Sequence, residues 1–237
     1  SLNEAQEKKL DLICKKLQLS AKDKVLDIGC GWGGFAKYAT EHYSCHVTGI
    51  TISKEQAKYA IEYTKGLPVE IKIQDYRDVS GTYDKILICG MIEHVGCKNY
   101  RNIMEIVYRC LADNGLFLLH TMGLNHDILA EDPWITKYIF PNSQIPTVVQ
   151  VGKSIEKLFV IEDWHNFGAD YDKTLMAWFD NFNKNWPHLK QKYSDRFYRM
   201  WKYYLLIFAA NFRIRYFQLW QIVLSKNGVP SGYQSIR

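Results

Sequence analysis

The stretch Val-Leu-Asp-Ile-Gly-Cys-Gly-Trp-Gly-Gly, residues 25–34, decides the fold of this chain. The apolar residues before Gly29 predict a short buried strand. Gly29, Gly31 and Gly33 predict a tight turn that lets the backbone approach a ligand closely, and a helix is expected to begin near Gly34. A strand, a glycine-rich turn and a helix in this order are typical of the first unit of a doubly wound α/β sheet.

Short apolar runs alternate with helical patterns on both sides of this stretch. The predicted strands cover residues 24–28, 45–50, 69–74, 83–89, 116–121, 160–166 and 217–225. The predicted helices cover residues 2–17, 34–42, 54–64, 100–110, 174–186 and 194–212. Strands that alternate with helices at this spacing form βαβ units, so we expect an α/β fold with a doubly wound, mostly parallel, seven-stranded sheet. Asn114-Gly115 predicts a turn. Residues 125–152 show no clear periodicity, and we expect the second half to insert a helical, aromatic-rich cover over one end of the sheet.

An acidic residue, Asp27, lies two positions before the first glycine of the turn. Dinucleotide-binding enzymes share a G-x-G sequence, but a carboxylate here would repel a pyrophosphate. S-adenosylmethionine carries an ammonium and a sulfonium cation and no phosphate, so an acid near the loop suits it. The G-x-G-x-G spacing after an acid is the pattern of S-adenosylmethionine-dependent methyltransferases and predicts that cofactor. A glycine-rich turn that binds nothing is the alternative.

Further polar residues follow the other predicted strands, and ligands of open α/β sheets gather at the carboxyl ends of strands. Thr51 and Gln56 stand where many methyltransferases have an acid for the ribose hydroxyls. Asp75 could accept a hydrogen bond from the adenine amino group, and Tyr76 could stack on the ring, although a surface aromatic is the simpler interpretation of Tyr76 alone. The candidate cofactor-binding residues are Asp27, Gly29, Gly31, Gly33, Thr51, Gln56, Asp75, Tyr76 and Gly90.

Composition limits the class of protein. The longest apolar candidate, residues 203–212, is much shorter than the ~20 residues of a membrane-spanning helix, and no signal-peptide pattern opens the chain. The six cysteines show no zinc spacing, so we expect no metal site and reduced thiols in a cytoplasmic protein.

Residues 184–215 carry eight basic side chains and one acidic side chain, interleaved with nine aromatic ones. Such a stretch could contact nucleic acid or anionic lipid, or could form a solvated helix face over the core.

Longer stretches of the sequence resemble the cyclopropane-fatty-acyl-phospholipid synthases, and mycolic acid cyclopropane synthases and other fatty acid methyltransferases are similar but more distant. The matching stretches are residues 25–34, 47–56 (VTGITISKEQ), 74–78 (QDYRD), 90–100 (GMIEHVGCKNY), 117–121 (FLLHT), 132–141 (DPWITKYIFP), 162–178 (EDWHNFGADYDKTLMAW) and 218–225 (QLWQIVLS). The family's N-terminal domain has no counterpart before Ser1. We therefore expect residues 1–237 to form a single methyltransferase domain, with a cofactor half over about 1–123 and the cover and final strands over about 124–237.

The resemblance implies a reaction and its site. Methyl passes from S-adenosylmethionine to the cis double bond of an unsaturated phospholipid acyl chain, and the carbocation then loses a proton and closes to a cyclopropane. The family holds a bicarbonate ion as the base, and its ligands fall on Glu93, His120 and Tyr171, with backbone near Met122. Glu93, His120 and Tyr171 are therefore the candidate catalytic residues. Without the resemblance, His120 would be read as a core histidine and Glu93 as a helix N-cap.

A carbocation must meet no water, because water would trap it as an alcohol. Aromatic rings exclude water and stabilise a cation through their faces. The candidate residues of such an acyl-chain pocket are Trp134, Tyr138, Phe140, Trp164, Phe167 and Trp178.

The resemblance further implies a protein that is peripheral on the inner face of the membrane, binds no nucleic acid and forms a homodimer in a full-length form. In residues 184–215 we expect Arg196, Arg199 and Lys202 to contact phospholipid head groups. Three alternatives stay open. They are a related fatty acid methyltransferase that gives an open-chain methyl or methylene product, a methyltransferase that binds nucleic acid through residues 184–215, and a fragment that binds cofactor or lipid without catalysis.

Overall fold

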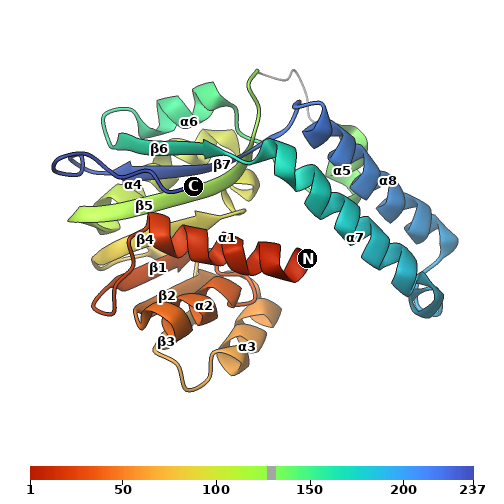
Figure 1. The fold of residues 1–237 in the computed structure, drawn as a ribbon, viewed down its shortest axis with the longest axis horizontal. Coiled ribbons are helices and arrows are strands. Elements are labelled where there is room, and N and C mark those ends of the chain that lie inside the picture. Colours follow the sequence, from red (N-terminus) through yellow and green to blue (C-terminus); the bar gives the residue numbers. More distant parts are fainter. Residues whose placement is uncertain (127–131) are drawn as a thin grey trace.

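One seven-stranded sheet organises the residues that the computed structural model describes, 1–126 and 132–237 (Figure 1). The strands lie in the order β3-β2-β1-β4-β5-β7-β6. Their bounds are β1 (Lys24–Ile28), β2 (His46–Thr51), β3 (Val69–Ile73), β4 (Tyr83–Cys89), β5 (Leu111–Gly123), β6 (Val160–Asn166) and β7 (Gln218–Ser225). Neighbours from β3 to β5 pair in parallel, whereas β7 pairs antiparallel with both β5 and β6. The predicted fold class, a doubly wound and mostly parallel seven-stranded sheet, is confirmed.

Helices cover both faces of the sheet (Figure 1). The longer ones are α1 (Leu2–Lys16), α2 (Gly34–Tyr43), α3 (Lys54–Tyr63), α4 (Tyr100–Cys110), α5 (Pro133–Tyr138), α6 (Val148–Ile155), α7 (Gly168–Leu189) and α8 (Asp195–Arg213), and the 3₁₀ turns are η1 (Tyr76–Asp78), η2 (Ile92–His94) and η3 (Cys97–Asn99). Leu26 and Ile28 of β1 belong to the core shared with α4 and α6, and Val25 belongs to the core shared with α1 and α2. Because successive strand side chains point to opposite faces, β1 is buried on both.

Helices α7 and α8 run side by side and extend beyond the sheet as an arm (Figure 1). A third core holds the arm together and includes Leu175 and Phe182 from α7 and Leu205 and Phe208 from α8. Its rings also stack on one another, with the ring centroids of Phe182 and Tyr198 5.5 Å apart. The arm is the predicted helical, aromatic-rich cover.

The structure extends two predicted elements. Strand β5 begins at Leu111 and contains the predicted Asn114-Gly115 turn, which the sheet accommodates as a register shift opposite β4. A Cβ at Gly115 would lie 2.8 Å from the carbonyl oxygen of Asp84, so the glycine permits the close approach of the two strands. Helix α7 also covers residues 168–189, where the sequence predicts 174–186.

Two helices occupy the segment in which the sequence shows no periodicity. Asp132 caps α5 by accepting a hydrogen bond from the N–H of Trp134, and Pro133 occupies the first turn. Thr147 and Gln150 form a capping box at the start of α6. Both starts carry recognised N-terminal signals, so the helices could have been predicted from their caps.

A buried ion-pair network joins α1 to β6 and to the last residue. The side chain of Lys16 is fully buried, and its Nζ lies 3.3 Å from Asp163 Oδ2 and 3.0 Å from His165 Nδ1. Arg237 also binds Asp163, at 2.6 Å. Burial lowers the pKa of Lys16 to about 8. Burial acts to raise the pKa of Asp163, but the hydrogen bonds and charges of Arg237 and Lys16 lower it on balance. The network fixes the start of the chain against the edge of the sheet.

Gly123→Ala should destabilise the protein, because a Cβ at Gly123 would overlap the ring of Trp220. Trp220 is buried and packs on Trp164, with ring centroids 5.1 Å apart, so it cannot move freely. We expect a loss of about 1–3 kcal/mol in the free energy of unfolding, measured by urea titration followed by tryptophan fluorescence. Gly152→Ala in α6 is the matched control: its Cβ would meet no atom within 4 Å, and it should stabilise by about 0.5–1 kcal/mol. An unchanged urea midpoint for Gly123→Ala would contradict this packing.

Candidate active site

The glycine-rich turn after β1 keeps backbone open at the carboxyl end of the sheet. Gly29, Gly31 and Gly33 have φ values of 83°, 55° and 82°, which glycine adopts readily. Gly29 is packed, since a Cβ there would lie 2.8 Å from the side chain of Met91. A Cβ at Gly31 would meet no heavy atom within 4 Å. The turn therefore offers an uncovered stretch of backbone at Gly31, against which a ligand can lie.

The other predicted cofactor-binding residues lie along the same edge of the sheet, because β3, β2, β1 and β4 are neighbours in that order. Thr51 ends β2, and its Oγ1 donates to Oε1 of Gln56 in α3 at 2.9 Å. Asp75 and Tyr76 follow β3, where Asp75 caps η1. Gly90 follows β4, and a Cβ there would meet no atom within 4 Å. At Gly31 and Gly90, which follow the adjacent strands β1 and β4, no atom covers the backbone, and this leaves room for an extended ligand.

The two carboxyl groups of this edge differ in charge state. Asp75 accepts hydrogen bonds from Nε and Nη2 of Arg77 at 2.9 and 2.7 Å, and these lower its pKa to about 2. Its carboxylate is therefore ionised at neutral pH. Asp27 is only 2% exposed, and burial raises its pKa to about 7. Arg77 balances the charge of Asp75, whereas Asp27 lies beside the glycine-rich turn, where an acid fits a cationic cofactor such as S-adenosylmethionine better than a pyrophosphate. The individual contacts of the nine predicted residues stay predictions.

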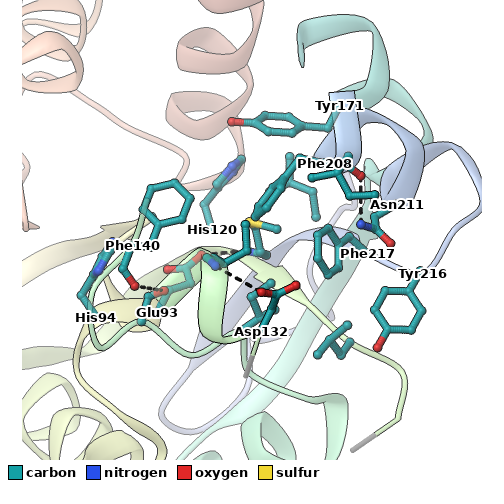
Figure 2. A pocket seen from close by; sticks show the side chains of 18 of the residues that line it. Glu93, His94, His120, Asp132, Phe140, Tyr171, Phe208, Asn211, Tyr216 and Phe217 are labelled. Atoms are coloured by element: carbon teal, nitrogen blue, oxygen red, sulfur yellow. Dashed lines mark hydrogen bonds between the residues drawn. The ribbon is translucent and has the colours of Figure 1, made fainter. Parts of the chain in front are cut away.

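A cavity of about 780 Å³ lies beside this edge, between the sheet and the arm. Its walls come from α1, the end of β4 with η2, β5, α5, α7, α8 and β7. The four residues assigned to bicarbonate by the resemblance, Glu93, His120, Met122 and Tyr171, all line it. Figure 2 shows three of them, Glu93, His120 and Tyr171, among the residues of the wall. Residues from distant parts of the chain are thus brought together at one place.

Glu93 is a buried acid with one free oxygen. Its side chain is 8% exposed, and Oε1 accepts a hydrogen bond from the N–H of Met122 at 2.8 Å. Oε2 has no hydrogen-bond partner within the described residues. Burial raises the pKa of Glu93. Since an unpaired buried acceptor costs about 1–3 kcal/mol, Oε2 points to a ligand that donates a hydrogen bond in this cavity.

His120 is held in one tautomer by Gln221. The two residues face each other across the antiparallel pair β5–β7, and Nδ1 of His120 lies 3.2 Å from Nε2 of Gln221. With the amide nitrogen of Gln221 facing the ring, Nδ1 accepts and the ring proton sits on Nε2, while Oε1 of Gln221 has no hydrogen-bond partner within the described residues. Burial lowers the pKa of His120 to about 3, which keeps the ring neutral at pH 7. His120 therefore offers one N–H donor that no residue in 1–126 or 132–237 accepts.

Tyr171 contributes a second donor from the first turn of α7. Its ring packs against Phe212 and Trp178, with centroid distances of 5.0 and 5.8 Å. Burial raises the pKa of its hydroxyl above the usual range, so the hydroxyl keeps its proton at neutral pH. The cavity thus combines a carboxyl acceptor with two neutral donors, which is the set that a small planar oxyanion carrying one proton requires.

The six predicted acyl-chain residues divide into two groups. Phe140 and Trp178 line the cavity. The other four lie outside the lining of the described cavity. Trp134 packs edge-on against Tyr203, with ring centroids 4.6 Å apart. Tyr138 contacts Arg196, Trp164 packs on Trp220 in the sheet core, and the ring of Phe167 packs at a tilt against His165.

Sequence reasoning missed several residues of the cavity wall. Gln6 and Lys9 of α1 line it, and so does Cys89 at the end of β4, whose pKa burial raises to about 11. Gln6, Lys9 and Ile13 lie three and four positions apart, so they share the face on which Ile13 is buried. The sequence did offer a signal for Gln6 and Lys9, because they are polar residues on the core-facing side of a predicted helix.

Comparisons with known proteins show which family and which solved structures this chain is similar to. The family model described as mycolic acid cyclopropane synthetase matches residues 1–222. Cyclopropane-fatty-acyl-phospholipid synthase of Escherichia coli (strain K12) is 52% identical over 237 residues, which are 100% of this chain and 62% of that protein. Sphingolipid C9-methyltransferase A of Emericella nidulans is 36% identical over 96% of this chain and 47% of its own length. The crystal structure of mycolic acid cyclopropane synthase CmaA1 complexed with SAH and CTAB superimposes with a TM-score of 0.88 at 28% identity, covering 95% of this chain and 86% of that one. The chain thus spans less than two thirds of the curated relatives that it matches.

The buried, neutral His120 predicts a specific loss of stability in acid. Its pKa of about 3 lies below the ordinary value of about 6.5, so the unfolded chain binds a proton before the folded protein does. Stability is therefore lost as the pH falls from about 6.5 towards 3. Between pH 7 and pH 5 we expect the free energy of unfolding of the wild type to fall by about 2 kcal/mol more than that of His120→Asn, measured by urea titration. Equal falls would show that His120 titrates normally.

Gln221→Leu should release the tautomer of His120. Without the amide donor, Nδ1 no longer needs to accept, so both neutral tautomers become populated. Long-range ¹H–¹⁵N spectra should show one protonated nitrogen, Nε2, in the wild type and averaged nitrogen shifts in the variant. Gln191→Leu, at an exposed position between α7 and α8, is the control and should leave the His120 signals unchanged. Identical spectra for Gln221→Leu and the wild type would contradict the assignment.

Proposed function

The chain belongs to the mycolic acid cyclopropane synthetase family, and we propose that it transfers a methylene group from S-adenosylmethionine to the cis double bond of an unsaturated phospholipid acyl chain. The product is a cyclopropane fatty acyl chain. The observation that carries the proposal is the unpartnered Oε2 of Glu93, which shares one buried cavity with the neutral donors His120 and Tyr171.

The residues of the sheet edge would hold S-adenosylmethionine, which when bound supplies an electrophilic methyl group. Gly31 and Gly90 leave the backbone uncovered at two adjacent strand ends, and Asp75 supplies a negative charge nearby. Gly90 lines the acyl-chain cavity as well, so the two sites meet at the end of β4. A methyl donor bound along the edge would therefore face a lipid in the cavity, as transfer to a weakly nucleophilic alkene demands.

The residues around Glu93 would hold a bicarbonate ion, which when bound supplies the base for the proton lost on ring closure. His120 Nε2 and the hydroxyl of Tyr171 donate hydrogen bonds to its oxygens, and Glu93 Oε2 accepts one from its hydroxyl. Lys9 adds a positive charge to the same wall, which favours an anion there. Burial raises the pKa of Glu93, so its carboxyl group accepts a proton more readily than an exposed one does.

The aromatic wall protects the cation that methyl transfer creates. Phe140, Phe208, Phe217 and Trp178 line the cavity and offer apolar surface to the reacting carbons. Their ring faces also stabilise a passing positive charge.

Because the proposed substrate is a membrane lipid, we expect the reaction to take place at a membrane surface. No helix among residues 1–126 and 132–237 is long and apolar enough to cross a membrane. We propose that the protein acts as a peripheral protein on the cytoplasmic face, and that any homodimer belongs to a longer form of the chain.

Incubation with S-adenosylmethionine and unsaturated phospholipid vesicles tests the function. A cyclopropane product adds one CH₂ to each modified acyl chain, which mass spectrometry detects, and its ring protons resonate at high field in NMR spectra. An open-chain methyl or methylene product would instead favour the related fatty acid methyltransferase. Methylation of a small soluble amine, with no lipid product, would refute both.

Glu93→Gln should lower turnover by about 10²-fold or more, because the amide has an N–H₂ group where a hydrogen-bond acceptor and proton carrier is needed. The substitution keeps the size of the side chain, so S-adenosylmethionine should bind with unchanged affinity in calorimetry. Glu41→Gln on the exposed face of α2 is the matched control and should retain full activity. Turnover within a factor of about two of the wild type would remove Glu93 from the mechanism.

A further inference from the structure

A shallow groove of about 500 Å³ runs along the outer side of α8. Six residues line it: Arg199, Lys202, Tyr203, Leu206, Ile207 and Ala210. The two cations lie towards the start of the helix and the aliphatic side chains follow one to two turns later. The groove is therefore polar and positive at one end and apolar at the other.

Both cations of the groove lack acidic partners. Neither Arg199 nor Lys202 forms an ion pair with any residue in 1–126 or 132–237, whereas Arg213 on the same helix binds Asp172 at 2.9 Å. Both side chains are exposed, and the nearest recorded contact of Lys202 Nζ is the ring of Phe179, 5.9 Å from its centroid. Two unpaired cations one helical turn apart match the spacing needed to bind one anionic group.

The groove and the active-site cavity share a wall. Tyr203 and Ile207 line both of them. Tyr203 directly follows Lys202, and Ile207 lies five positions beyond Lys202, or ~7.5 Å along the helix axis. A molecule with its anionic part at Lys202 can thus continue along apolar side chains to the cavity that contains Glu93.

We propose that Arg199 and Lys202 bind the phosphate of the phospholipid whose acyl chain enters the cavity. This proposal rests on the function proposed above and names the part of the substrate that the groove recognises. Arginine binds phosphate oxygens in pairs and lysine adds a point charge, while Leu206 and Ala210 contact the first acyl carbons. The head group stays outside, and only the acyl chain enters the cavity.

The packing of α8 favours a lipid over a nucleic acid. Binding of single strands requires exposed rings on which bases stack. Phe197, Tyr198, Trp201 and Tyr204 pack in the core of the arm, and Tyr203 is the one exposed ring of α8, so the helix offers no run of rings on which successive bases could stack. Arg196 contacts Tyr138 rather than the groove, so of the three basic residues expected to meet head groups, Arg199 and Lys202 remain.

The first test measures membrane binding without catalysis. Vesicles of dimyristoyl phosphatidylglycerol and dimyristoyl phosphatidylcholine in equal amounts have no double bond, so binding does not depend on turnover. We expect Arg199→Glu/Lys202→Glu to bind at least about tenfold more weakly than the wild type in flotation assays at low salt. Lys22→Glu/Lys153→Glu changes the net charge equally at exposed positions away from the groove and should bind within about twofold of the wild type.

The second test asks whether the groove recognises the phosphate group of the substrate. Dioleoyl phosphatidylglycerol and diolein, each dispersed in neutral detergent, carry the same acyl chains with and without that group. Arg199→Ala/Lys202→Ala should raise KM for the phospholipid by about tenfold and leave both kcat and the KM for diolein unchanged. A neutral micelle removes the general attraction to a charged surface from this comparison.

Three results would overturn the proposal. They are equal vesicle binding by the two charge-reversed variants, equal changes of KM for the phospholipid and for diolein, and tighter binding of single-stranded RNA than of the vesicles, lost in Arg199→Glu/Lys202→Glu. If neither lipid gives a cyclopropane with the wild type, the proposed function fails, while the vesicle assay still decides the role of the groove.

Discussion

The N–H of Met122 holds Glu93 Oε1 at 2.8 Å and leaves Oε2 with no partner in a cavity lined by aromatic rings. The carboxyl group of Glu93 thus has one oxygen fixed by the backbone and one oxygen without a partner among the described residues. Burial raises the pKa of Glu93 and lowers that of His120, and it keeps the hydroxyl of Tyr171 protonated. Burial therefore keeps His120 and Tyr171 as neutral hydrogen-bond donors at neutral pH.

The sheet and the arm supply different parts of this arrangement. The sheet fixes the polar groups: β4 with η2 positions Glu93, β5 positions His120, and β7 holds His120 through Gln221. The arm supplies the apolar wall and one hydroxyl, that of Tyr171. The backbone of the sheet thus carries the polar groups of the cavity, and long side chains on two helices form its apolar wall.

Local patterns were sufficient to predict the sheet, because strands such as those at residues 24–28 and 83–89 are largely buried apolar runs bounded by clear turn residues. The short helices α5 and α6 were not predicted, since their caps rather than their periodicity define them. Tertiary contacts could not be predicted from the sequence. His120 and Gln221 are 101 residues apart, and nothing local indicates that two polar side chains in apolar strands meet across the sheet. The aromatic residues show the same limit: Trp178 and Trp164 stand in similar sequence surroundings, yet one lines the cavity and the other packs on Trp220.

The pairing of β7 has a consequence for how this chain can diverge. Gln221 stands opposite His120 on one side and His165 on the other, so one register places all three side chains on the same face. A slip of one residue would present Trp220 or Ile222 to His120 and would exchange the two faces of the strand. Insertions or deletions between α8 and β7 are thus tolerated only when the loop absorbs them completely. The length of that connection, an ordinary loop by its composition, is thus constrained by the register of β7.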